Sequence, residues 1–138
     1  MWLKTRQRLL LVKSFETYRS AYQRTGAPYL GINVATLALL LGRAEECDRE
    51  ARAICDKLGA KATSDLDSWD RATLAEAFLC IGDESSALEW YELAAVLALN
   101  RPQEIAVMRR QARLIYEQRG KDSSALQGAL PTPKVIAF

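Results

Sequence analysis

The sequence predicts an all-α fold of about six helices, arranged as antiparallel pairs that stack on one another. Apolar residues recur at helical spacing, no stretch of strand length alternates between apolar and polar residues, and glycines, prolines or polar turns separate the periodic segments. A chain of 138 residues has the length of one ordinary domain. We therefore expect one helical-repeat domain over residues 1–120 and an irregular tail over residues 121–138.

Each expected helix has a recognisable beginning or end. The first carries an apolar stripe through Phe15 and Tyr22 and should stop at Gly26, since glycine is the usual residue after a helix. Asp67 or Ser68 can cap the fourth helix. In the tail, the terminal segment 135–138 could pack in an extended form. The expected helices span about residues 4–25, 29–41, 44–58, 69–81, 84–99 and 102–118.

Two parts of the chain resemble each other. Residues 36–54 and residues 73–94 both begin with an alanine-rich helix that ends in Leu-Gly or Ile-Gly, and a second helix follows a short turn. The second part matches the tetratricopeptide pattern of large, small and aromatic positions closely. An unrelated helical bundle with similar helix ends is the alternative. The matching positions are Leu74, Ala75, Phe78, Gly82, Ala87, Tyr91 and Ala94.

The resemblance predicts a short tetratricopeptide-like superhelix. The turn glycines Gly42 and Gly82 are 40 residues apart, whereas the tetratricopeptide period is about 34 residues. The excess falls in the polar connector before Trp69, where an insertion between repeats is tolerated. No single helix pair can bury its apolar face alone, so the pairs should stack.

Composition argues against catalysis. The chain has no histidine and no glycine-rich phosphate loop, which removes Ser-His-Asp and Cys-His systems and the usual zinc ligands. Cys47, Cys55 and Cys80 have neither zinc nor CxxC spacing, so we interpret them as small buried apolar residues. We expect a protein that is not an enzyme and that has no cofactor or metal.

Charge and hydropathy exclude some classes of partner. Residues 1–26 hold six basic side chains against one acid, residues 43–98 six against thirteen, and residues 101–121 six against two. This layout lacks the broad basic stripe of a DNA or RNA duplex binder and suggests a local positive site near the last helix. No apolar run is long enough to span a membrane, and none resembles a signal peptide, so we expect a cytoplasmic protein.

The first helix of each stacked pair should line the concave face, so polar and aromatic residues there are the candidate ligand-binding residues. Arginine is the preferred partner of phosphate and carboxylate, and exposed aromatic rings can stack on a base. A solvated surface, paired with the acidic fifth helix, is the alternative for the arginines, and core packing is the alternative for the aromatic residues. The candidates are Tyr29, Asn33, Thr36, Trp69, Thr73, Glu76, Arg109, Arg110 and Arg113.

Residues 14–118 also resemble a particular tetratricopeptide variant. The segments 29–33 and 35–37, with Trp69 and residues 72–77, are similar to the TRAFs-binding region of apoptosis-signal-regulating MAP3 kinases and to the bacterial sensor-type domains called TPR-S. This resemblance implies a regulatory module. In bacterial defence proteins such domains are fused to effectors and are thought to sense a nucleotide-derived signal, and in the kinases the region serves partner binding.

Two functions therefore remain open. The first is a sensor that binds an anionic, nucleotide-like small molecule and controls a fused or partner effector domain. The second is a scaffold that binds a peptide or protein partner. Glu76 would repel phosphate if it lay free in the groove, but it would support the sensor if it held an arginine or accepted from a base edge. Exposed repeat ends could also pair chains into a homo-oligomer.

Overall fold

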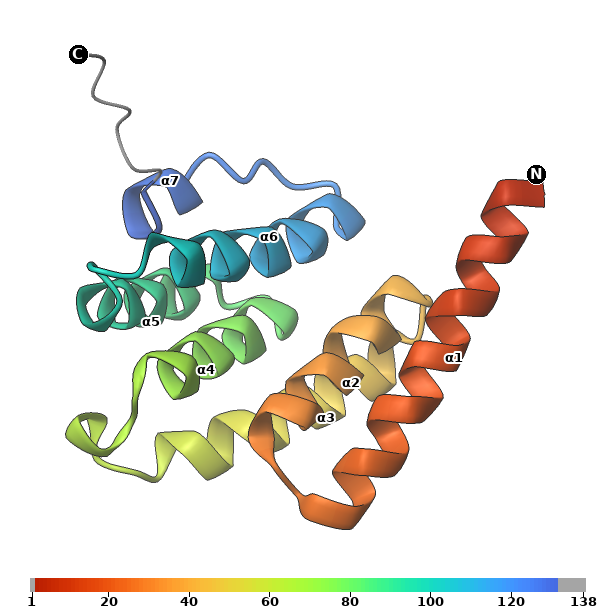
Figure 1. Cartoon of the computed structure of the whole chain (residues 1–138), viewed down its shortest axis with the longest axis horizontal. Coiled ribbons are helices and arrows are strands. Elements are labelled where there is room, and N and C mark those ends of the chain that lie inside the picture. Colours follow the sequence, from red (N-terminus) through yellow and green to blue (C-terminus); the bar gives the residue numbers. More distant parts are fainter. Residues whose placement is uncertain (1, 132–138) are drawn as a thin grey trace.

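The computed structural model describes residues 2–131 and confirms the all-α prediction for this part of the chain, which contains no strand. Figure 1 shows the helices as a stack, with α1 at one end and α6 with α7 at the other. The predicted helix boundaries agree with the structure to within a few residues. The elements are α1 (Trp2–Thr25), α2 (Pro28–Leu40), α3 (Ala44–Gly59), the 3-10 turn η1 (Thr63–Asp65), α4 (Ser68–Cys80), α5 (Glu84–Leu97), α6 (Pro102–Gln118) and α7 (Leu126–Ala129).

The turns that end α2, α4 and α6 have the same backbone geometry. Gly42, Gly82 and Gly120 have φ angles of +79°, +88° and +64°, a conformation that glycine adopts without a Cβ clash. The residue after each glycine donates its N–H to a carbonyl five residues earlier. These bonds are Arg43 N to Ala38 O (2.8 Å), Asp83 N to Phe78 O (2.9 Å) and Lys121 N to Tyr116 O (3.0 Å). These three helices therefore end in the same type of turn.

The helices α2, α4 and α6 lie side by side. Contacts join α2 to both α4 and α6, and α4 to α6, while α3 packs on α2 and α5 packs on α4. Fully buried alanines, among them Ala35, Ala38, Ala75 and Ala77, let the helices approach closely. The stacked helix pairs predicted from the sequence are thus confirmed.

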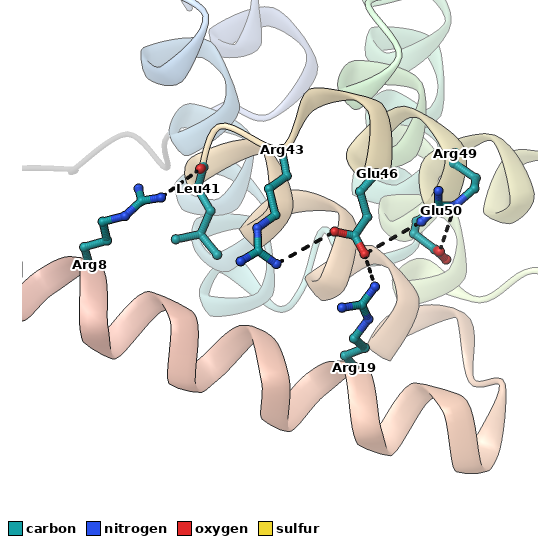
Figure 2. Close-up of polar contacts among 7 residues, drawn as sticks. All are labelled: Arg8, Arg19, Leu41, Arg43, Glu46, Arg49 and Glu50. Atoms are coloured by element: carbon teal, nitrogen blue, oxygen red, sulfur yellow. Dashed lines mark hydrogen bonds and ion pairs between the residues drawn. The ribbon is translucent and has the colours of Figure 1, made fainter.

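The helix α1 covers the outer side of the first pair. Its Phe15 is fully buried, and the guanidinium carbons of Arg19 and Arg43 lie 5.1 and 4.9 Å from the centre of the Phe15 ring. Both arginines also pair with Glu46, which Arg49 approaches at 3.7 Å (Figure 2). One carboxylate thus draws together arginines from α1, the α2–α3 turn and α3.

A glycine in α2 allows α1 to approach. A Cβ on Gly31 would lie 2.7 Å from the Tyr22 ring, closer than real Cβ contacts. The aromatic ring therefore occupies the space that any larger side chain would need. This contact gives a structural reason for the glycine in segment 29–33.

The connector between α3 and α4 is folded against the domain. Leu66 is buried, and the guanidinium of Arg71 donates to the carbonyls of Thr63 (3.1 Å), Leu66 (3.0 Å) and Leu93 (3.0 Å). Asp67 caps α4, because its Oδ1 accepts from the Asp70 N–H at 2.7 Å. The connector thus fixes the beginning of α4 in place.

The segment after residue 121 contributes more to the core than the sequence suggests. Leu126 and Leu130 are buried, and α7 contacts α5. Arg109 donates to the carbonyls of Leu130 and Pro131, both at 3.1 Å. The expectation of an irregular tail therefore misses the short helix α7, whereas segment 135–138 lies outside the described residues.

Candidate functional site

A cavity of about 200 Å³ opens between α2, α4 and α6, and α5 closes its floor. Five of the nine candidate residues predicted from the sequence lie around it: Tyr29, Asn33, Trp69, Thr73 and Glu76. We call this cavity the central groove. The complete lining is Tyr29, Ile32, Asn33, Trp69, Ala72, Thr73, Glu76, Tyr91, Val107, Met108 and Gln111.

The mouth of the central groove carries two aromatic rings in equivalent positions. Tyr29 and Trp69 each stand 13 residues before the glycine that ends their helix, and their side chains are 60% and 42% exposed. Core packing, the alternative interpretation of these residues, does not fit such exposure. The repeat therefore places one exposed ring from α2 and one from α4 at the same hollow.

Two polar residues follow one turn further along the same helices. Asn33 and Thr73 each stand nine residues before the turn glycine of their helix, and both line the central groove. Asn33 donates from its Nδ2 to the carbonyl of Tyr29 at 2.8 Å, which fixes the orientation of its amide. The walls below the rings thus offer hydrogen-bonding groups.

The floor of the central groove holds a buried carboxyl group. Glu76 is only 8% exposed, and its Oε2 accepts a hydrogen bond from Thr36 Oγ1 at 2.6 Å. Burial raises the pKa of Glu76 to about 7, and the Thr36 hydrogen bond offsets part of that effect. Thr36 was predicted to line the groove. In the structure it is instead buried and bound to Glu76.

Sequence reasoning missed the second polar group of the floor, Tyr91 on α5. Tyr91 is 1% exposed, lines the central groove, and its hydroxyl has no hydrogen-bond partner among the described residues. Burial and the nearby charge of Glu76 raise the pKa of Tyr91 well above its usual value. An unpartnered buried hydroxyl destabilises a fold by about 1–3 kcal/mol. Comparison of the two repeats could have singled out Tyr91. Tyr91 stands nine residues after Gly82, and the residue nine after Gly42 is Ala51, which has no polar group.

The arginines of α6 do not belong to this groove. Val107 and Gln111 stand 13 and nine residues before Gly120, the same offsets as the lining residues of α2 and α4. The predicted wall residues Arg110 and Arg113 are one and two residues away from Gln111 along the chain. Successive side chains point about 100° apart around a helix axis, so these arginines point away from the groove. The predicted orientation of α6 was wrong for this reason.

The three arginines instead border a separate hollow on the outer side of α6, together with Ala106, Leu114 and Glu117. Arg110 and Arg113 are exposed, whereas Arg109 is buried and bound to the backbone of the C-terminal segment. Within residues 6–131 no ion pair joins these arginines to α5, so the proposed pairing with the acidic helix is not found.

A second hollow of about 410 Å³ adjoins the mouth of the central groove. It shares Tyr29, Trp69 and Thr73 with the central groove and adds Pro28, Asp67 and Asp70. No lysine or arginine is among the described residues that line either hollow. Carboxyl groups therefore lie on both sides of the aromatic rings, a setting that attracts positive charge and hydrogen-bond donors and repels phosphate.

The described residues contain neither a membrane-spanning helix nor a cluster of metal ligands. None of the helices in residues 2–131 is both long and apolar enough to cross a membrane. Nor does this range contain a group of three or more His, Cys, Asp or Glu side chains that could hold a metal ion. Comparison with known proteins adds no identification, because no family model, curated protein or solved structure matches the chain.

Proposed function

We propose that this chain is a non-catalytic sensor module of the tetratricopeptide type, which binds a small ligand in the central groove and controls a fused or partner effector. The convergence of Tyr29, Trp69, Glu76 and the unpartnered Tyr91 hydroxyl on one hollow carries the proposal. Binding pockets commonly combine apolar walls with a few convergent polar groups of this kind. The resemblance to sensor-type domains of bacterial defence supports the same function.

The proposal of an anionic, nucleotide-derived ligand needs a restriction. The aromatic rings suit the face of a nucleobase, and the Glu76 carboxyl could accept from an exocyclic amine. Phosphate groups, in contrast, would have no basic partner among the residues that line the groove. A nucleotide would therefore have to enter base first and leave its phosphates in solvent.

A thermal-shift panel tests the proposed function. It contains nucleosides, nucleotides, cyclic dinucleotides, ADP-ribose, small amines and guanidines. A ligand present at a hundredfold excess over its Kd stabilises the folded state by about 2.7 kcal/mol. We expect at least one member to raise the Tm, and Trp69→Ala to reduce that shift. The absence of any shift across all classes would reject the sensor function.

The scaffold alternative is favoured by a different surface. Leu93, Val96 and Leu97 on α5, with Leu99 just after it, are 38%, 63%, 41% and 71% exposed. Contiguous exposed apolar groups often mark protein interfaces. Sedimentation equilibrium of the wild type and of Val96→Asp tests whether this surface pairs copies of the chain. A monomeric wild type would exclude a homo-oligomer through α5.

A further inference from the structure

We propose that the ligand of the central groove is an organic cation with hydrogen-bond donors, a guanidinium or primary ammonium group on a short apolar stem, which contacts Glu76 and Tyr91 beneath the Tyr29 and Trp69 rings. The inference rests on the proposed function and names its ligand class. The proposed site is the central groove together with the hollow that adjoins its mouth.

The floor offers hydrogen-bond acceptors, and the described residues place no positive charge in it. Among the described residues Glu76 has one hydrogen-bond partner, Thr36 Oγ1, although a carboxylate can accept about four hydrogen bonds. The Tyr91 hydroxyl has no partner in the described part of the chain and can accept as well as donate. A guanidinium carries five N–H donors and no acceptor, so it complements these two groups.

The mouth is suited to the same charge. A cation over the face of a tyrosine or tryptophan ring is attracted by the ring quadrupole. Tyr29 and Trp69 are exposed, and neither ring contacts a cation of the described residues within the cation–π distances found elsewhere in the fold. Asp67 and Asp70 in the adjoining hollow add negative charge on the outer side of the rings.

Size also restricts the ligand. A cavity of about 200 Å³ is only slightly larger than an engineered cavity of about 150 Å³ that holds one benzene. The inner part of the groove therefore admits a single small group, and any larger ligand would extend into the adjoining hollow. Ile32, Ala72 and Met108 provide the apolar wall against which a short stem would pack.

The test uses a matched pair of probes, butylguanidine and butylurea, which have almost the same shape but differ in charge. Titration calorimetry at pH 8, where Glu76 is mostly ionised, should show butylguanidine binding at least about tenfold more tightly than butylurea. The variant Glu76→Gln should remove this preference, Tyr91→Phe should reduce it, and Arg110→Ala should leave it unchanged. Circular dichroism verifies that each variant is folded.

Other outcomes separate this inference from the proposed function. Three results would contradict the proposal that the ligand is a cation. They are equal affinity for the two probes, an unchanged preference in Glu76→Gln, and no binding of butylguanidine at a Kd below about 10 mM. If AMP binds and butylguanidine does not, and if Trp69→Ala weakens the binding of AMP, the sensor function is supported and the proposed cationic ligand is wrong. If neither probe nor any panel compound binds, both are wrong.

Two further probes identify the source of the cation. Agmatine represents a free metabolite, and an acetylated, amidated Gly-Arg-Gly peptide represents the side chain of a protein partner. Tighter binding of agmatine assigns a small-molecule signal, and tighter binding of the peptide assigns an arginine of a partner chain. Either result supports the cation class, and weaker binding of both than of butylurea contradicts it.

Discussion

The groove side of α2 and α4 and the outer side of α6 have similar helical backbones but opposite electrostatic character. The first is lined by aromatic rings, amide and hydroxyl groups and a buried carboxyl, whereas the second carries Arg109, Arg110 and Arg113. The difference comes from position in the stack, because α4 is flanked by α2 and α6. On the outer side of α6, Arg110 and Arg113 are exposed and Arg109 is bound to the backbone of Leu130 and Pro131. The helix α6 carries three arginines, yet it faces the central groove with Val107, Met108 and Gln111. A cluster of arginines on a helix therefore does not show that they face the groove.

The largest expected effect concerns the charge of Glu76. Its folded-state pKa of about 7 lies above the usual 4.5, so the folded protein holds this proton more tightly than the unfolded chain. The stabilisation is complete below pH 4.5 and is lost as pH rises to 7. The total difference is about 3 kcal/mol.

The variant Glu76→Gln should therefore be more stable than the wild type at pH 8, by up to about 3 kcal/mol, and similar to it at pH 4. Urea denaturation at the two pH values measures this. The neighbouring Cys80 and Tyr91 do not titrate in this window, since the pKa of each is raised well above its usual value. If the difference in the free energy of unfolding between the two proteins is the same at both pH values, Glu76 does not titrate with a raised pKa in the floor of the groove.

A second prediction compares one repeat position in two helices. Ala75 and Arg113 both stand seven residues before their turn glycine, but Ala75 is fully buried and Arg113 is exposed. Ala75→Leu should destabilise the fold by about 1–3 kcal/mol through overpacking. Arg113→Leu should change stability by less than about 0.5 kcal/mol. Similar losses in both variants would mean that the outer side of α6 is covered.

A third prediction compares two buried tyrosines. The Tyr116 hydroxyl donates to Glu84 Oε2 at 2.6 Å, whereas the Tyr91 hydroxyl has no partner among residues 6–131. Tyr116→Phe should therefore destabilise the protein by about 1–2 kcal/mol, and Tyr91→Phe should leave stability unchanged or raise it slightly. Thermal unfolding of the two variants at one pH measures the contrast. A larger loss for Tyr91→Phe would reveal a hydrogen bond in the floor.

The comparison also explains what sequence reasoning could predict. The Leu-Gly and Ile-Gly helix ends and the apolar periodicity predicted the helix pairs, because these signals are local. The wall residues Asn33 and Thr73 were predicted because both copies keep the same distance from the turn glycine. This shared spacing predicts that the two side chains lie on the same face of their helices, even when the tertiary contacts are unknown.

The errors arose where neighbours in space decide the outcome. The orientation of α6 is an exception, because the offsets of 13 and nine residues from Gly120 give Val107 and Gln111 from the sequence itself, and they were not applied to this helix. Tyr91 was identified only as an aromatic position of the repeat pattern, since nothing in the sequence shows that its hydroxyl lacks a partner among the described residues. The docking of Leu126 and Leu130 depends on α5 and on the Arg109 hydrogen bonds, which a segment of this length cannot reveal.

The central claim is that ligand binds between α2, α4 and α6 and not at the arginines of α6. The most direct measurement is the Kd of the panel compound that gives the largest thermal shift, for Trp69→Ala and for the double variant Arg110→Ala with Arg113→Ala. Loss of a stacking ring should weaken binding about tenfold or more, while the double variant should bind like the wild type. Weaker binding only in the double variant would contradict the account.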